Sequence, residues 1–363
     1  MAVSVDVVKA ALQGLVDPNT QKDFVSSRSA KNIKVDGDDV SFDIELSYPA
    51  KSQIDTIRKQ VIGAVKALPG VGNVSANVHV KIVSHAVQRG LKPLPGVKNI
   101  IAVASGKGGV GKSTTAVNLA LALAQEGATV GMLDADIYGP SQPQMLGLTG
   151  LQPESTDGKS MEPLQAYGIQ AMSIGFLIDV ETPMVWRGPM VTQALEQMLN
   201  ETNWKDLDYL VVDMPPGTGD TQLTLAQKVP VTGAVVVTTP QDIALLDARK
   251  GLKMFEKVGV PILGIVENMS IHICSNCGHA EHIFGAGGGE TMCKDYNVEF
   301  LGALPLELAI REMADSGKPT VVGAPDSTAA EIYRGIARRV AVKVGETAKD
   351  MSSKFPSIVV QNT

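Results

Sequence analysis

Two cysteines of this sequence stand at a spacing that suits a metal centre. Cys274 and Cys277 have two residues between them and lie in the stretch IHICSNCGHAEHIF, which also holds three of the five histidines. Thiolates at this spacing bind one iron–sulfur cluster or one zinc ion, but both centres usually take four ligands. The third cysteine, Cys293, stands alone in the sequence, so there is no second pair at this spacing. The pair is therefore half of a four-thiolate site.

Several arrangements would complete or replace this half site. A second copy of the chain, related by a twofold axis, would present the same patch and bring the ligands to four. Within one chain, the three histidines of the stretch would have to join the cysteines around zinc, a cramped spacing that matches no common zinc module. These histidines are His272, His279 and His282. A redox role fits less well, because no thioredoxin-like βαβ pattern flanks the pair. Cys293 is interpreted as a small buried residue, with a spare cluster ligand as the alternative.

A glycine-rich loop gives the most specific motif in the chain. The residues GKGGVGKS fit the pattern G-x-x-x-x-G-K-[ST], and they follow an apolar strand and precede a helix, as this motif requires. Glycines let backbone N–H groups surround phosphate oxygens, and the following helix adds its dipole. Lys112 is expected to reach the β- and γ-phosphates, and the Ser113 hydroxyl to bind Mg²⁺. The residues expected to contact the nucleotide are Gly106, Lys107, Gly108, Gly109, Val110, Gly111, Lys112, Ser113 and Thr114.

Carboxylates follow two further apolar runs, where phosphoryl transfer needs them. Asp213 ends the run YLVVD and is expected to hold the metal ion or its waters. Asp134 and Asp136 stand at the end of another run, MLDAD, and Asp136 is the candidate to position the attacking water. A surface turn is the alternative interpretation of either aspartate taken alone. Catalysis is therefore assigned to Lys112, Asp136 and Asp213.

Composition excludes several classes of protein. The chain of 363 residues has 32 basic and 38 acidic residues, a net charge of -6, which argues against a dedicated nucleic-acid binder. Three cysteines are too few for a disulfide framework and indicate a reducing compartment. The first residues resemble neither a signal nor a transit peptide, and no run approaches the roughly 18 apolar residues that span a bilayer. We expect a cytoplasmic protein that binds neither membrane nor nucleic acid.

Hydrophobic patterning predicts two domains. Residues 1–84 mix helical spacing with alternating strands and are expected to form a small α+β domain. A linker rich in proline and glycine follows at 85–99. From residue 100 short continuous apolar runs alternate with helices, which is typical of a mostly parallel sheet covered by helices. The expected fold is thus an α/β P-loop NTPase at 100–345 after a small α+β domain, with a tail at 346–363.

The motifs together resemble a known class of ATPases. Lys107 inside GKGGVGKS makes the loop similar to the deviant Walker A loop of the MinD, ParA and nitrogenase iron-protein ATPases. The blocks DADIYGPSQP, SIGF, WRGPM (186–190), VVDMPPGTGD, TTPQDIALLDARKG and ENMS resemble the Mrp/ApbC branch of this class. Members of that branch are iron–sulfur cluster carriers. Residues 1–84 look like the small domain that precedes the ATPase in bacterial members and occurs alone in Fe–S maturation factors.

This resemblance implies a function and a set of partners. It implies a homodimer in which Lys107 reaches the partner's phosphates and Cys274 and Cys277 share a bridging [4Fe-4S] cluster across the axis. It also implies that Asn268 reads the adenine, so that ATP with Mg²⁺ is the nucleotide. The expected function is transfer of iron–sulfur clusters to apo-proteins, with scaffold proteins as further partners. The alternative is a ParA- or MinD-like positioning ATPase with a structural zinc at the cysteine pair.

Overall fold

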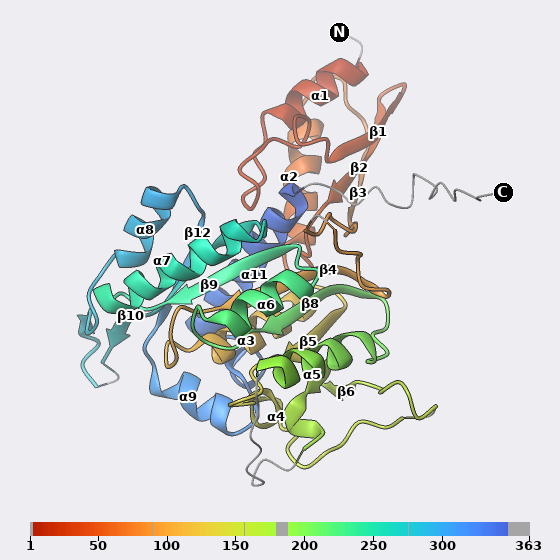
Figure 1. Cartoon of the computed structure of the whole chain (residues 1–363). Helices are drawn as coiled ribbons and strands as arrows, with labels where there is room; N and C mark the ends of the chain where they lie inside the picture. Colours follow the sequence, from red (N-terminus) through yellow and green to blue (C-terminus); the bar gives the residue numbers. More distant parts are fainter. Residues whose placement is uncertain (1–2, 89, 156, 179–187, 275, 348–363) are drawn as a thin grey trace, which may run out of the picture.

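The computed structural model describes residues 3–88, 90–155, 157–178, 188–274 and 276–347. Two segments singled out in the sequence fall partly outside these ranges. They are the first two residues of the motif at 186–190 and most of the predicted tail at 346–363. Within the described ranges the strands form two sheets, one near the N-terminus and one in the body of the molecule (Figure 1).

The N-terminal part folds as a small sheet covered by helices. Its elements are α1 (Val5–Gln13), β1 (Ala30–Asp36), β2 (Asp39–Leu46), α2 (Ile54–Lys66) and β3 (Val74–Val80). Strand β2 lies in the middle, antiparallel to β1 and parallel to β3. Alternate residues of β2 are buried, and α2 buries one stripe of apolar side chains, as their spacing predicts. Strand β1 was not predicted, because this edge strand is largely polar and exposed.

The body of the molecule is built on a larger sheet. Its strands run in the order β11-β10-β9-β4-β8-β5-β7-β6 through the described residues, with β12 paired to β10. The bounds of these strands are β4 (Val97–Ala104), β5 (Val130–Asp134), β6 (Leu164–Ala166), β7 (Ile169–Ser173), β8 (Leu207–Asp213), β9 (Gly233–Thr238), β10 (Ile262–Ile273), β11 (Ala280–Glu281) and β12 (Phe300–Pro305). The pairs are parallel except at β6 and β11. The predicted mostly parallel sheet is therefore confirmed.

Helices cover both faces of this sheet, which explains why its central strands are apolar throughout. One layer contains α3 (Lys112–Gln125) and α11 (Thr328–Glu346), which pack on each other, and the opposite layer contains α5 (Gly188–Asn200), α6 (Asp220–Lys228) and α7 (Asp242–Lys257) (Figure 1). The remaining helices are α4 (Gln142–Met145), η1 (Ile174–Phe176), α8 (Gly288–Tyr296), α9 (Leu308–Asp315) and α10 (Thr320–Gly323). Helix α11 buries one stripe of apolar side chains.

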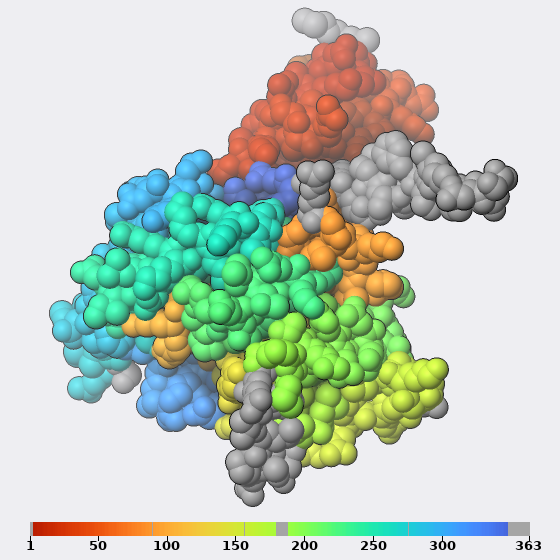
Figure 2. All heavy atoms as spheres, in the orientation of Figure 1, coloured from red at the N-terminus to blue at the C-terminus, as the bar shows by residue number. Residues whose placement is uncertain are grey.

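The N-terminal part lies against the end of α11 (Figure 2), and hydrogen bonds join it to the end of α3. Glu126, the residue after α3, is 1% exposed, and its carboxylate accepts hydrogen bonds from the Ser52 hydroxyl at 2.7 Å and the Ser52 N–H at 3.0 Å. Arg338 of α11 donates to the same carboxylate at 2.5 Å. A buried charge needs such partners, because leaving it unpaired costs several kcal/mol. Helix α3 therefore starts at the glycine-rich loop and ends at the contact with the N-terminal part.

Candidate functional site

The predicted phosphate-binding residues meet at one edge of the larger sheet. The glycine-rich loop follows Ala104, the last residue of β4, while Asp134 and Asp213 are the last residues of β5 and β8. Strand register places Asp134 beside Asp213 and Asp213 beside Val103. In open α/β sheets, ligands bind outside the carboxyl ends of the strands. The chain's catalytic candidates are thus gathered where a nucleotide is expected.

The loop owes its shape to glycines that no other residue could replace. Gly111 has a φ of +81°, and a β-carbon there would lie 2.2 Å from Nδ2 of Asn268. Gly106 packs against α7, so that a β-carbon would meet the carbonyl carbon of Asp247 at 2.1 Å. Both distances are well below van der Waals contact. The glycines therefore allow close packing of the loop as well as its turn.

A cavity of about 290 Å³ opens above this loop. Its walls include six of the predicted nucleotide-contacting residues together with Asp136, namely Gly108, Gly109, Gly111, Lys112, Ser113 and Thr114. Gly106, Lys107 and Val110 lie outside the cavity wall. Lys107 is half-buried, and its carbonyl accepts a hydrogen bond from the Ser105 hydroxyl at 2.8 Å. The cavity combines the N-terminus of α3 with a lysine, which suits the phosphates of a nucleotide.

Lys112 is buried among carboxylates and hydroxyls. Its side chain is 6% exposed, and its Nζ contacts Oδ1 of Asp213, lies 3.9 Å from Oδ2 of Asp136 and donates to Ser113 Oγ at 3.1 Å. Burial raises the pKa of Asp136, while the Lys112 charge acts in the opposite direction. The three predicted catalytic groups of this edge are therefore within direct reach of one another. Lys112 supplies the positive charge that two neighbouring buried carboxylates require.

Asp134, the last residue of β5, has a different position from Asp136, which follows the strand. Its carboxylate is fully buried and accepts hydrogen bonds from the N–H groups of Ser141 and Gln142, each at 3.1 Å, and from Ser173 Oγ at 3.1 Å. Burial, and after it the charge of Asp213, raises the pKa of Asp134. Asp134 thus fixes the segment after β5, whereas Asp136 lines the cavity.

Gln142 belongs to the same group of residues, although the sequence did not single it out. A glutamine has no signature in a turn, and its contacts involve residues 29 and 71 positions away. The signal was the block DADIYGPSQP itself, because the N–H groups of Ser141 and Gln142 near its end bind the carboxylate of Asp134 at its start.

Strand β10 connects the glycine-rich loop to the cysteines. Asn268 is 9% exposed, and its Nδ2 donates to the carbonyl of Val110 at 2.9 Å. The strand continues past Asn268 to Ile273, directly before Cys274. The two predicted sites are therefore joined by one short segment of backbone, which has an irregularity at Met269, where φ is +57°.

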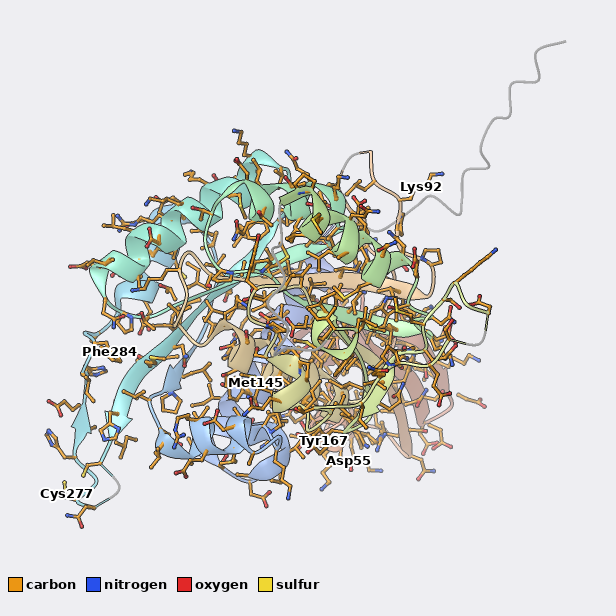
Figure 3. The ribbon with its side chains drawn as sticks, turned by 60° about the horizontal axis from the view of Figure 1, so that its bottom comes forward. Asp55, Lys92, Met145, Tyr167, Cys277 and Phe284 are labelled. Carbon is orange, nitrogen blue, oxygen red and sulfur yellow. The ribbon has the colours of Figure 1, made fainter. Side chains whose placement is uncertain are left out.

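The cysteines lie in a hairpin at the outer end of β10. Strand β11 pairs with β10 through His272 and Glu281, and the Cys274 N–H donates to the His279 carbonyl at 2.9 Å. Cys274 is half-buried and Cys277 exposed, and Cys277 lies at the tip of the hairpin, away from the body of the molecule (Figure 3). The N–H groups of Cys277 and, next, Asn276 lower the pKa of the Cys274 thiol. Both thiols are accessible, and Cys274 is disposed to bind metal as a thiolate.

The described part of one chain does not assemble a zinc site here. No group of three or more His, Cys, Asp or Glu side chains among the described residues is close enough to hold a metal ion. The rings of His272 and His282 are tied through Nδ1 to the carbonyls of Leu306 at 2.9 Å and Ser270 at 2.8 Å. The single-chain zinc arrangement therefore finds no support in the geometry.

Cys293 lies apart from the hairpin, on α8. It is 5% exposed, its Sγ donates to the Glu299 carbonyl at 3.4 Å, and burial raises the pKa of its thiol to about 12. Its interpretation as a small buried residue is confirmed.

In the described part of the chain, no helix has the length and apolar character needed to cross a membrane.

Comparisons with known proteins place these features in a family. Residues 96–341 match the NUBPL iron-transfer P-loop NTPase family, and residues 6–78 match the iron–sulfur cluster assembly protein family. The iron–sulfur cluster carrier protein of Pseudomonas fragi is 61% identical over 76% of this chain and 96% of the relative. The iron–sulfur cluster carrier protein of Escherichia coli K12 is 50% identical over 93% of this chain and 92% of the relative.

A solved structure gives the same result for the fold. The nucleotide-binding protein of Archaeoglobus fulgidus, in complex with ADP, superposes with a TM-score of 0.57 and is 36% identical over 65% of this chain and 92% of that chain. These similarities confirm the resemblance inferred from the motifs, and with it the predicted ATPase of the P-loop class. With a glycine-rich loop, two strand-end carboxylates and a family match over most of its length, the chain belongs to the NUBPL iron-transfer P-loop NTPase family.

Proposed function

We propose that this protein is a homodimeric carrier that delivers [4Fe-4S] clusters to apo-proteins and uses ATP and Mg²⁺ to do so. The observation that carries the proposal is the connection through β10. Its Asn268 contacts the phosphate-binding loop, and six residues later the same backbone presents a pair of accessible thiols. In this proposal, β10 carries the effect of nucleotide binding to the cysteines that hold the cluster.

The nucleotide half of the proposal assigns a role to each residue of the cavity. Lys112 neutralises the β- and γ-phosphates, Ser113 and Asp213 hold Mg²⁺, and Asp136 positions the attacking water. The residues fit Mg²⁺ and a nucleotide, because Lys112 contacts both Ser113 and Asp213 beside a cavity lined by the glycine-rich loop. Bound Mg²⁺ would supply positive charge next to the transferred phosphoryl group. Lys112, now held by Asp213, would move its ammonium group to the phosphates.

Two residues extend this assignment beyond the cavity of one chain. Lys107 lies outside the cavity wall and is half-buried. On the resemblance to ATPases with the deviant Walker A loop, we assign it to the phosphates of the partner's nucleotide. Asn268 offers both a donor and an acceptor for the adenine edge. Its contact with Val110 keeps it beside the loop that would hold the phosphates.

The cargo half requires two chains. One chain provides Cys274 and Cys277, and a twofold axis near the hairpin tips would bring four thiolates around one cluster. Thiols at an exposed tip release a cluster more readily than buried ones, which suits a carrier. Apo iron–sulfur proteins and scaffold proteins are the expected partners, and neither nucleic acid nor membrane belongs among them.

The remaining assignments concern organisation and location. We assign residues 1–84 to a small domain, 85–99 to a linker, 100–345 to the ATPase domain and 346–363 to a tail. Strand β4 already begins at Val97, so the regular structure starts slightly before residue 100. All three cysteines are free thiols, which agrees with a reducing compartment and with the cytoplasm.

A transfer assay tests the proposal. The full-length protein is reconstituted anaerobically with iron and sulfide, freed of excess reagents and mixed with a purified apo-protein that needs a [4Fe-4S] cluster, in the presence of an iron chelator. The acceptor should gain its cluster from the wild type but not from Cys274→Ala protein treated in the same way. Equal gain from both proteins would show that free iron and sulfide, not the hairpin, supply the acceptor.

A further inference from the structure

Gln142 is a buried amide that touches three parts of the phosphate-binding edge. It is the first residue of α4 and is 1% exposed. Its Nε2 donates to Oδ2 of Asp213 at 2.9 Å and to the carbonyl of Ser113 at 3.2 Å. Its own N–H donates to Oδ2 of Asp134 at 3.1 Å. The side chain thus links the end of β8 to the first turn of α3, and the backbone N–H of the same residue adds the end of β5.

The two oxygens of Asp213 are shared between two side chains. Lys112 contacts Oδ1, and Gln142 holds Oδ2. A carboxylate that keeps one fixed hydrogen bond keeps its orientation when its other oxygen changes partner. If Lys112 leaves for the phosphates, Oδ1 becomes free while Oδ2 stays bound to the amide.

Stability alone does not account for a glutamine at this position. Its Oε1 is buried and has no hydrogen-bond partner among the described residues. A buried polar atom without a partner costs free energy, so such atoms are rare and call for an explanation. The side-chain amide of Gln142 leaves Oε1 without a partner while its Nε2 holds the carboxylate of Asp213. This arrangement agrees with a role for Gln142 in the site.

We propose that Gln142 is a positioning residue, which orients the Asp213 carboxylate so that its free oxygen faces the magnesium ion of a bound Mg–nucleotide. The inference rests on the proposed assignment of Asp213 to Mg²⁺ and adds a residue that acts through Asp213. Partners that orient a metal ligand typically contribute about 10- to 100-fold to metal affinity or activity.

The test compares nucleotide binding with and without Mg²⁺ in the full-length protein. Gln142→Met keeps the length of the side chain and removes its hydrogen bonds. Binding of a fluorescent ADP analogue is titrated with Mg²⁺ and repeated in EDTA. The Mg²⁺ concentration for half-maximal binding should rise roughly 10-fold, while affinity in EDTA stays within about twofold of the wild type. In ATP hydrolysis, kcat should fall about 10-fold with little change in KM.

Gln144→Met provides the matched control, because Gln144 is an exposed glutamine of the same helix. It should leave both titrations unchanged. If Gln142→Met leaves the Mg²⁺ dependence within about twofold of the wild type, or weakens binding equally in EDTA, Gln142 does not act on the metal site and the inference is wrong. If that variant does not fold, Gln142→Asn, which keeps the amide but shortens its reach, is expected to shift the Mg²⁺ titration in the same direction. An unshifted titration for a folded Gln142→Asn protein would equally overturn the inference.

Asp213→Asn separates this inference from the assignment on which it rests. A loss of Mg²⁺ dependence in Asp213→Asn without a shift in Gln142→Met would contradict only the role of Gln142. An unchanged Mg²⁺ dependence in Asp213→Asn would instead contradict the proposed metal site itself.

Discussion

The phosphate-binding edge and the cysteine hairpin differ in how far one chain completes them. At the edge, Lys112 and Asp213 are buried and make hydrogen bonds with each other and with neighbouring residues of the same chain. At the hairpin, Cys277 is exposed, and no third metal-ligating side chain lies close enough among the described residues. At the phosphate-binding edge, the charged side chains are already paired with each other. At the hairpin, the Cys277 thiol faces solvent without a complete set of metal ligands from the same described chain.

This difference agrees with the separate roles proposed for the two regions, phosphate binding at the sheet edge and cluster binding at the hairpin. Groups that stabilise phosphate charge must be oriented before the substrate arrives, because reorganising them during reaction costs rate. Groups that pass on a cargo must be reachable by another protein. Strand β10 connects the two regions, so a single strand has one end buried beside the glycine-rich loop and the other end at the accessible cysteines.

The largest effect is expected from removing Lys112. In Lys112→Ala, ATP hydrolysis should fall by about 100-fold or more, because the phosphates lose their main positive charge. Asp213 and Asp136 would also be left as neighbouring buried carboxylates, which should lower the free energy of unfolding by about 3 kcal/mol. Steady-state hydrolysis and urea unfolding measure the two effects.

Lys107→Ala is the variant for comparison in nucleotide binding, because Lys107 belongs to the same loop but lies outside the cavity wall. It should bind a fluorescent ADP analogue with wild-type affinity and lose hydrolysis. Weak ADP binding by Lys107→Ala would mean that this lysine serves the nucleotide of its own chain.

The next effect should be confined to the hairpin. Cys274→Ser or Cys277→Ser should reduce reconstituted cluster to about one tenth or less of wild type, since serine rarely replaces a thiolate in such clusters. Hydrolysis by the cluster-free protein should change less than about twofold, because the phosphate-binding edge is complete without the hairpin. Absorbance and iron analysis measure the cluster. A strong loss of hydrolysis without cluster would contradict the division between the regions.

Asn268 tests the connection between the regions. In Asn268→Asp, a carboxylate oxygen would face the Val110 carbonyl in place of the donating Nδ2. The loop should be displaced and nucleotide affinity should fall about 10-fold, the equivalent of one lost hydrogen bond and an unfavourable contact. Asn200→Asp on the exposed end of α5 is the control. Isothermal titration with ADP distinguishes the two variants, and equal affinities would show that the contact with Val110 does not shape the nucleotide site.

The smallest effect concerns Cys293. Because burial raises its pKa to about 12, its thiol should remain protonated near neutral pH and resist alkylation by iodoacetamide, while Cys274 and Cys277 react. Peptide mass analysis after brief labelling of the cluster-free protein checks this order. Cys293→Ala should leave the cluster content unchanged, and a loss of iron would assign Cys293 to the cluster.

The sequence predicted what depends on local spacing. The glycine-rich loop, its flanking strand and helix, and Asp213 at the end of β8 were all found, because each is encoded within a few consecutive residues. The alternating pattern of β2 and the buried stripe of α11 follow from simple periodicity. Strand β7, in contrast, was missed, because five residues ending in a serine give too short a pattern.

Contacts between distant residues could not be predicted in this way. Asn268 and Val110 are 158 positions apart, and Ser52 and Glu126 are 74 apart. The hydrogen bonds of Gln142 depend on how two strand ends and a helix come together, which no local pattern records. The extension of β10 to Ile273 depends on pairing with β11 and β12, since its last residues alternate between polar and apolar types.

Native mass spectrometry of the anaerobically reconstituted, full-length protein tests the central claim most directly. If two hairpins together hold the cargo, the cluster should appear with the mass of two chains and about four irons, and it should be absent from single chains. Cys277→Ser protein should show no such species. A cluster or a zinc ion bound with full occupancy to a single chain would contradict the account, because one hairpin would then be a complete site.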